Sequence, residues 1–191
     1  MVIDLYHGSP NILEKPIFGQ GKKYNDYGLG FYCTYSLEMA KEWAAGKDKD
    51  GYANHYKLDC SELNILELNS KNYCILHWLA VLLKNREFDT PAGLAYEAKE
   101  YLLKNFMVDY ESYDAIIGYR ADDSYFSFAQ DFINGTISYR QLNNAMHLGK
   151  LGEQFVLKSK KSFDLLQFVD FELADSREWY AKKISRDKMA R

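Results

Sequence analysis

The expected strands and helices of this chain follow one another in mixed order, and this order limits the fold more than any other feature of the sequence. Alternating apolar residues predict a strand at 2–7 that runs into the turn Gly8-Ser9-Pro10. Further strands are expected at 31–35, 56–58, 66–68, 113–119, 154–158 and 165–173. Helices are expected after Ser36, at 73–85 and 92–104, between Asp122-Asp123 and Gly135, after Ser138, and after Asp175. Because strands and helices do not alternate strictly, an α+β fold is favoured over a doubly wound parallel sheet.

The chain is expected to form one domain over residues 1–191. It has no repeat, low-complexity tract or linker, and 191 residues are too few for two ordinary domains. With 47% hydrophobic and 27% charged residues, it can bury a substantial core. Residues 11–30, rich in Gly, Lys, Asn and Asp, predict a long loop, and such loops within compact domains are usually functional.

Charge and cysteine content exclude several classes of protein. A net charge of −3 gives no general attraction to nucleic acids or acidic membranes. The short basic runs at 22–23 and 158–161 are expected to be solvated surface, although either could contact a phosphate. Three cysteines without a CxxC pair favour neither a disulfide framework nor a zinc site. Without a signal peptide or a membrane-spanning apolar run, we expect a soluble cytoplasmic protein that has no bound metal and no membrane partner.

Three short segments, each placed where a strand meets a loop, carry candidate ligand-binding chemistry. In Tyr6-His7-Gly8-Ser9, an imidazole stands beside backbone that a planar ligand can approach closely. In Gly28-Leu29-Gly30-Phe31-Tyr32, glycines make room beside an aromatic face, and Trp43 in the following helix could close the far side of a slot. In Gly152-Glu153-Gln154, a strand begins with polar side chains able to reach a hydroxyl. Taken singly, each segment also fits an ordinary turn, core position or strand end.

In this order and spacing, the three segments resemble the His, Tyr and Glu motifs of ADP-ribosyltransferases of the diphtheria-toxin and poly-ADP-ribose-polymerase-like branch. The pattern is most similar to a bacterial ADP-ribosyltransferase-like family, through Leu5-Tyr6-His7-Gly8-Ser9, residues 27–34, Ala121-Asp122-Asp123 and a late strand containing Gln154. The resemblance covers nearly the whole chain. It implies a mixed, largely antiparallel split sheet with flanking helices around an NAD+ cleft.

The resemblance implies NAD+ as co-substrate and gives roles to the matching residues. The backbone of Gly8 would anchor the nicotinamide, His7 would bind a ribose hydroxyl on the adenosine side, and Tyr32 would lie near the nicotinamide ribose. Ser9 and Gly30 complete the matching NAD+-binding backbone. Trp43 falls where poly-ADP-ribose polymerases carry the aromatic residue that stacks on the cationic ring, a contact worth roughly 0.5–2 kcal/mol.

Aromatic residues make up 16% of the chain, and their positions divide them into two groups. The core is expected to hold most of them, including Phe88, Tyr101, Phe132, Phe163 and Phe168. Tyr32 and Trp43, with Tyr27 or Tyr35, are instead expected to face a flat cationic ring.

The sequence departs from the family at the residue that would stabilise positive charge on the ribose. The family carries a Glu that grips the ribose 2′-hydroxyl, whereas the best overlay places Gln154 there and Glu153 one residue earlier. Adjacent side chains of a regular strand point to opposite faces, so only one of the two can enter the cleft. The overlay favours Gln154, and His7, Tyr32 and Gln154 are therefore the expected catalytic residues.

A glutamine supplies no negative charge, so chain elongation is not expected, and mono-ADP-ribosyl transfer, slow hydrolysis and loss of activity all stay open. Asp122 or Asp123 is a second source of a carboxylate, although helix capping explains both at least as well. The segment 146–152, which contains His147 and Lys150, lies where this fold recognises its acceptor.

The expected function is mono-ADP-ribosyl transfer to an unidentified protein or nucleic acid. Analogy with the family adds the role of toxin in a toxin–antitoxin or phage-defence pair, with a small antitoxin protein as partner. The alternative is a weak or inactive NAD+- or nucleotide-binding module on the same fold. RNA 2′-phosphotransfer is disfavoured because the chain lacks the extra basic domain and the several Arg anchors of that group.

Overall fold

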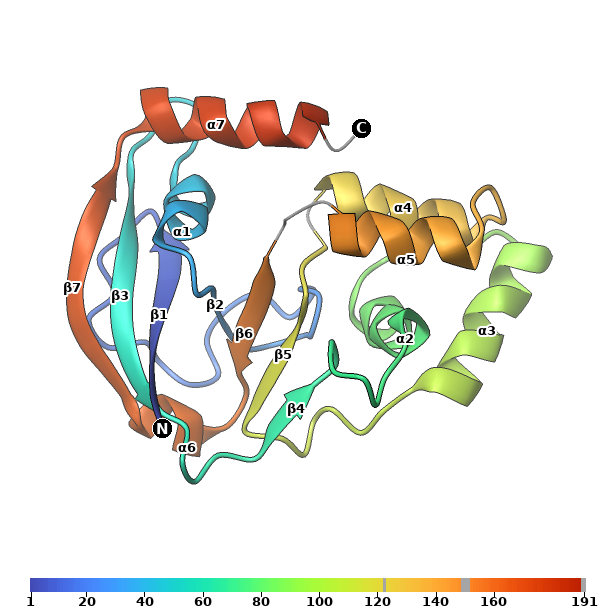
Figure 1. Ribbon diagram of the computed structural model, residues 1–191, viewed down its shortest axis with the longest axis horizontal. Coiled ribbons are helices and arrows are strands. Elements are labelled where there is room, and N and C mark those ends of the chain that lie inside the picture. The colour runs from blue at the N-terminus through green and yellow to red at the C-terminus, as the bar shows by residue number, and fades with distance from the viewer. Residues whose placement is uncertain (122, 149–151, 190–191) are drawn as a thin grey trace.

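The chain folds around two β-sheets that meet at one edge (Figure 1). The computed structural model describes residues 1–121, 123–148 and 152–189. The first sheet has the order β1-β3-β7 and is antiparallel throughout. Its strands are β1 (Val2–Ser9), β3 (Gly51–Asp59) and β7 (Leu166–Ala174).

The second sheet has the order β2-β6-β5-β4 and mixes two orientations, because β4 runs parallel to β5 while the other neighbours are antiparallel. Its strands are β2 (Phe31–Cys33), β6 (Glu153–Leu157), β5 (Ala115–Tyr119) and β4 (Ile65–Glu67). An isolated bridge between Tyr6 in β1 and Thr34 after β2 joins the two sheets. The predicted α+β class with a mixed, split sheet is confirmed.

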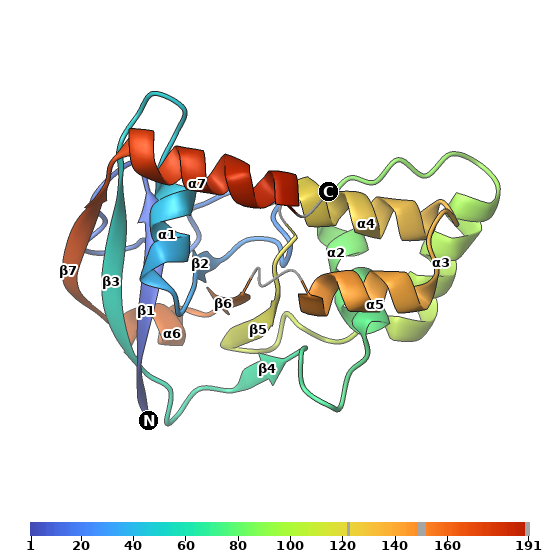
Figure 2. The same ribbon diagram turned by 45° about the horizontal axis from the view of Figure 1, so that its top comes forward.

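Helices cover the two sheets separately (Figures 1 and 2). Helix α1 (Leu37–Ala44) contacts β1 and β3, and α7 (Ser176–Met189) contacts α1 from outside. As the sequence predicts, the Ser36 side chain caps α1 by accepting the N–H of Met39. The second sheet is flanked by α2 (Ile75–Asn85), α3 (Leu94–Phe106), α4 (Asp123–Ile133) and α5 (Tyr139–Leu148). The short helix α6 (Lys160–Asp164) connects β6 to β7.

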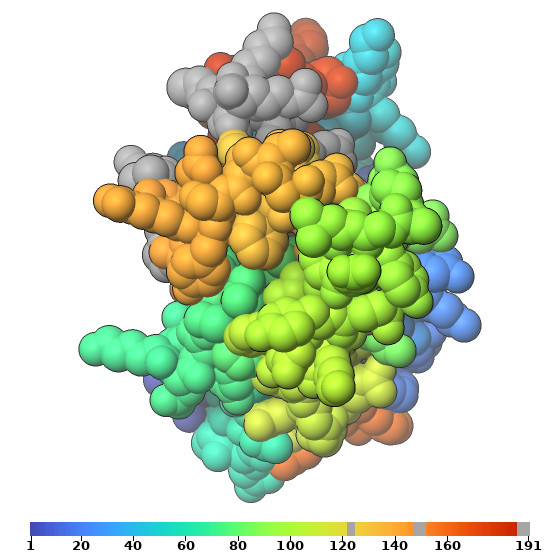
Figure 3. Space-filling view, turned by 90° about the vertical axis from the view of Figure 1, so that its right-hand side faces the viewer, coloured from blue at the N-terminus to red at the C-terminus, as the bar shows by residue number. Residues whose placement is uncertain are grey.

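Helix α2 lies at the centre of the larger core. Trp78, Leu79, Val81 and Leu82 are fully buried there, and a helix that is apolar on most sides needs neighbours on most sides. Helix α3 is less apolar than α2, and together with α5 it forms much of the surface seen in Figure 3. Among the described residues, no helix is both long and apolar enough to cross a membrane.

Several expectations from the sequence are wrong. Tyr101, expected in the core, is 61% exposed, because α3 buries only a narrow face. Tyr27, considered as a ligand-facing ring, is fully buried, and its hydroxyl donates to the carbonyl of Tyr119. Helix α6 was not predicted. Lys158, expected on the solvated surface, is only partly exposed, because its long aliphatic stem lets the ammonium reach two backbone carbonyls inside the fold.

Candidate functional site

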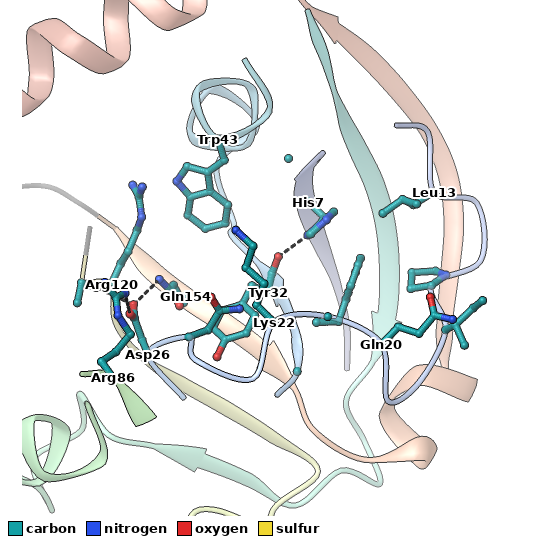
Figure 4. A pocket seen from close by; sticks show the side chains of 18 of the residues that line it. His7, Leu13, Gln20, Lys22, Asp26, Tyr32, Trp43, Arg86, Arg120 and Gln154 are labelled. Carbon is teal, nitrogen blue, oxygen red and sulfur yellow. Dashed lines mark hydrogen bonds and ion pairs between the residues drawn. The ribbon is translucent and has the colours of Figure 1, made fainter. Parts of the chain in front are cut away.

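A pocket of about 520 Å³ opens where the two sheets part, and its size is typical of small-molecule sites. Its wall combines β1, the loop 11–30, β2, α1 and β6 with the segments that follow α2 and β5 (Figure 4). The pocket brings together six residues that the sequence analysis singled out as candidates: His7, Gly8, Gly30, Tyr32, Trp43 and Gln154.

His7 presents a hydrogen-bond acceptor to this pocket. Its Nδ1 lies 2.7 Å from the carbonyl oxygen of Tyr32, and its ring stacks on Phe31 with 4.2 Å between the ring centroids. A carbonyl can only accept, so Nδ1 carries the proton and Nε2 is the acceptor. Burial lowers the pKa of His7, which keeps the imidazole neutral at neutral pH.

Gly8 offers backbone groups along the edge of β1. Tyr6 donates to and accepts from Thr34 through its own backbone, at 2.8 and 2.9 Å. Since the backbone groups of residues i and i+2 on a strand point to the same edge, the N–H and C=O of Gly8 point along the edge where the pocket begins. A Cβ on Gly8 would lie 2.1 Å from the carbonyl oxygen of Ala40, so the glycine is also required for packing against α1.

Tyr32 contributes its ring to the pocket wall, while its hydroxyl forms hydrogen bonds with the loop 11–30. That hydroxyl donates to the carbonyl of Gly28 at 2.6 Å and accepts the N–H of Tyr27 at 3.0 Å. Burial raises the pKa of Tyr32 well above its usual range, so the phenol stays neutral. Lys158 braces the same loop by donating to the carbonyls of Tyr27 and Leu29, at 2.7 and 2.6 Å.

Trp43 projects from α1 into the pocket, and the guanidinium of Arg120 lies over its ring. The guanidinium carbon of Arg120 lies 4.9 Å from the ring centroid of Trp43, within the range of cation–π attraction. The indole Nε1 of Trp43 is buried and has no hydrogen-bond partner among the described residues. The indole therefore combines an apolar face with a polar group that a ligand could engage.

Four charged residues of the pocket were missed by the sequence reasoning: Lys15, Asp26, Arg86 and Arg120. Asp26 is 4% exposed, and its Oδ1 accepts from Nη1 of Arg86 at 2.9 Å. The Oδ2 of Asp26 accepts from the backbone N–H of Ala121 at 2.8 Å and from Nε2 of Gln154 at 3.1 Å. No local motif marks these residues, although the expected functional loop 11–30 contains Asp26.

Glu153 and Gln154, the first two residues of β6, face different environments. Gln154 is 5% exposed and lines the pocket, and its Oε1 has no hydrogen-bond partner within the described part of the chain. Glu153 is exposed and accepts a hydrogen bond from Asn69. Strand alternation thus turns Gln154, and not Glu153, toward the pocket.

Other candidates from the sequence lie elsewhere. Ser9 is buried away from the pocket wall and accepts the N–H of Asn11 at 3.1 Å. Asp122 and Lys150 fall outside the described residues, as do the side chains of Asp123 and His147, so their expected roles stay predictions.

Fold and site together define an α+β protein with a pocket at the junction of two sheets, and the wall of this pocket includes five charged residues: Lys15, Lys22, Asp26, Arg86 and Arg120. The chain belongs to the family described as "Protein of unknown function (DUF3990)", whose model matches residues 3–168. No curated protein and no solved structure matches the chain.

Proposed function

We propose that this protein is an NAD+-dependent mono-ADP-ribosyltransferase that modifies a protein or nucleic acid. The observation that carries the proposal is the convergence of His7, Tyr32, Trp43 and Gln154 on one pocket. These residues come from β1, β2, α1 and β6, and the motif resemblance selects all four. Function is argued from this constellation and not from the fold class, since one fold hosts many activities.

The polar groups of the pocket suit the parts of NAD+. Nε2 of His7 and Oε1 of Gln154 are acceptors for ribose hydroxyls, and the edge of Gly8 suits a carboxamide. Three cationic side chains of the wall would balance an anionic diphosphate, namely Lys15, Lys22 and Arg120, while Arg86 is paired with Asp26.

The reaction breaks the bond between the ribose C1′ and the nicotinamide nitrogen, and nicotinamide leaves with the bonding electron pair. A nucleophilic oxygen or nitrogen of the acceptor bonds to C1′ and releases its proton to solvent. Positive charge develops on the ribose, so an acceptor atom on the 2′-hydroxyl is most useful in the transition state. We assign that role to Oε1 of Gln154, and its lack of a hydrogen-bond partner among the described residues supports the assignment.

Incubation with labelled NAD+ and a cell lysate tests the proposal. We expect labelled macromolecules and released nicotinamide from the wild type, and neither from His7→Ala or Gln154→Ala. Unchanged labelling in both variants would contradict the assigned site.

A nucleotide-binding module is the second candidate, because Gln154 is an amide where the related enzymes carry a carboxylate. In that case calorimetry would detect NAD+ binding that His7→Ala weakens, while no nicotinamide appears with any lysate. The two candidates therefore differ in turnover and not in binding.

The role of toxin, with a small protein as its antitoxin, is a proposal from the family resemblance. Expression of the wild type is expected to arrest bacterial growth, and His7→Ala is expected to relieve the arrest. Equal toxicity of the two proteins would argue against this role.

A further inference from the structure

Asp26 is a buried carboxylate for which the motif resemblance has no role. It lies in the loop 11–30, at one end of the pocket beside Arg86, Arg120 and Gln154 (Figure 4). Its two oxygens accept three hydrogen bonds, from a guanidinium, a backbone N–H and the amide of Gln154. Burying a carboxylate costs free energy even when donors surround it, so we expect Asp26 to do more than pack the loop 11–30.

The contact with Asp26 determines how Gln154 faces the pocket. A carboxylate only accepts, so the Gln154 amide must turn its Nε2 toward Asp26 and its Oε1 away from it. That Oε1 is buried without a partner among the residues described. A glutamine held in this way turns its acceptor oxygen away from Asp26, so that this oxygen can act as a carboxylate oxygen would.

The same contact brings a carboxylate next to the Gln154 amide. Burial raises the pKa of Asp26 above its usual value, and the N–H of Ala121, the guanidinium of Arg86 and the Gln154 amide limit this rise. Three donors surround the two oxygens, and each of them favours the ionised carboxylate. A hydrogen bond to an ionised acceptor polarises the donor amide and increases the partial negative charge on its oxygen. Gln154 carries no negative charge where the resemblance expects a Glu, but the Asp26 carboxylate lies one hydrogen bond away from it.

We propose that Asp26 is a positioning residue that fixes the Gln154 amide with Oε1 toward the ribose 2′-hydroxyl of NAD+ and transmits to it the negative charge that related enzymes carry on a Glu. This inference rests on the proposed function. Neither residue exchanges a proton during the reaction, since C1′ passes from nicotinamide to the acceptor while the 2′-hydroxyl only donates a hydrogen bond.

Exchanging the two side chains tests the pair. Asp26→Asn removes the charge, and Gln154→Glu places two carboxylates in contact, so each single variant is expected to lower kcat for nicotinamide release at least tenfold, with a smaller change in KM. The double variant Asp26→Asn/Gln154→Glu restores one carboxylate and one amide. It is expected to exceed both single variants about tenfold, which a purely structural Asp26 would not produce.

Glu153→Gln is the matched control, because Glu153 precedes Gln154 on β6 and is exposed outside the pocket wall. It is expected to keep the wild-type kcat. Thermal unfolding of every variant separates loss of fold from loss of turnover, and a folded, active double variant supports the inference even if a single variant unfolds.

The outcomes distinguish the two levels of the proposal. If the wild type neither binds NAD+ nor releases nicotinamide, the proposed function fails and the inference fails with it. If the wild type is active but Asp26→Asn retains its kcat, or the folded double variant is no better than the single variants, the inference alone is overturned.

Discussion

His7 in β1 donates a hydrogen bond from Nδ1 to the carbonyl oxygen of Tyr32 in β2, with 2.7 Å between the two atoms. This bond links the two sheets beside the Tyr6–Thr34 bridge and leaves the imidazole Nε2 as an acceptor in the pocket. One interaction therefore contributes to both the architecture of the site and its chemistry.

The neutral state of His7 predicts a pH dependence of stability. Burial lowers its pKa in the folded protein, whereas the unfolded chain has a His pKa of about 6.5. Between these two values the unfolded chain binds more protons, so the stability from neutral His7 is complete above about pH 6.5 and is lost as the pH falls below it.

Urea denaturation of the wild type and His7→Gln measures this effect. The difference in unfolding free energy between the two proteins should shift against the wild type as the pH falls from about 7.5 to about 5. A difference independent of pH would contradict a buried neutral imidazole.

Gly8→Ala should destabilise the fold whether or not a ligand binds. The added Cβ would meet the carbonyl oxygen of Ala40 at 2.1 Å and the backbone nitrogen of Ala44 at 2.8 Å. Overpacking against backbone should cost about 1–3 kcal/mol or more in urea denaturation. Gly46→Ala is the control, because its Cβ meets no atom closer than 3.5 Å and should change stability by less than about 0.5 kcal/mol.

Lys158→Met should loosen the loop that carries Asp26 and Tyr27. It removes charge-assisted hydrogen bonds to the carbonyls of Tyr27 and Leu29, and we expect a loss of about 2 kcal/mol in denaturant unfolding. Lys160→Met, which removes only an exposed ion pair with Asp164, should cost less than about 0.5 kcal/mol. Equal losses would show that Lys158 does not brace the loop.

Trp43→Ala should weaken NAD+ binding without preventing folding, because Trp43 is only partly buried in α1. Loss of the aromatic platform and of its contact with Arg120 should raise the Kd about five- to thirtyfold, equivalent to about 1–2 kcal/mol. Trp43→Phe keeps a ring and should retain most of the affinity. Calorimetric titration with NAD+ measures both, and equal affinities of wild type and Trp43→Ala would remove Trp43 from the site.

The sequence alone determined most of the local elements and part of the pocket wall. The strand predicted at 2–7, the Ser36 cap of α1 and the strand containing Gln154 depend on neighbouring residues, and all three occur in the structure, although β1 continues to Ser9. Local hydrogen bonds and side-chain periodicity are encoded within a few residues, so pattern reasoning reaches them.

Only the tertiary structure decided how the site is completed. Asp26, Arg86 and Gln154 lie far apart in the chain and carry no shared motif, yet the pairing of β2, β6 and β5 brings them into hydrogen-bond contact. Strand periodicity alone likewise did not decide which face of β6 lines the pocket, because neither face of that strand is clearly polar. Long-range contacts of this kind depend on strand register and loop closure over the whole fold, which no short sequence window contains.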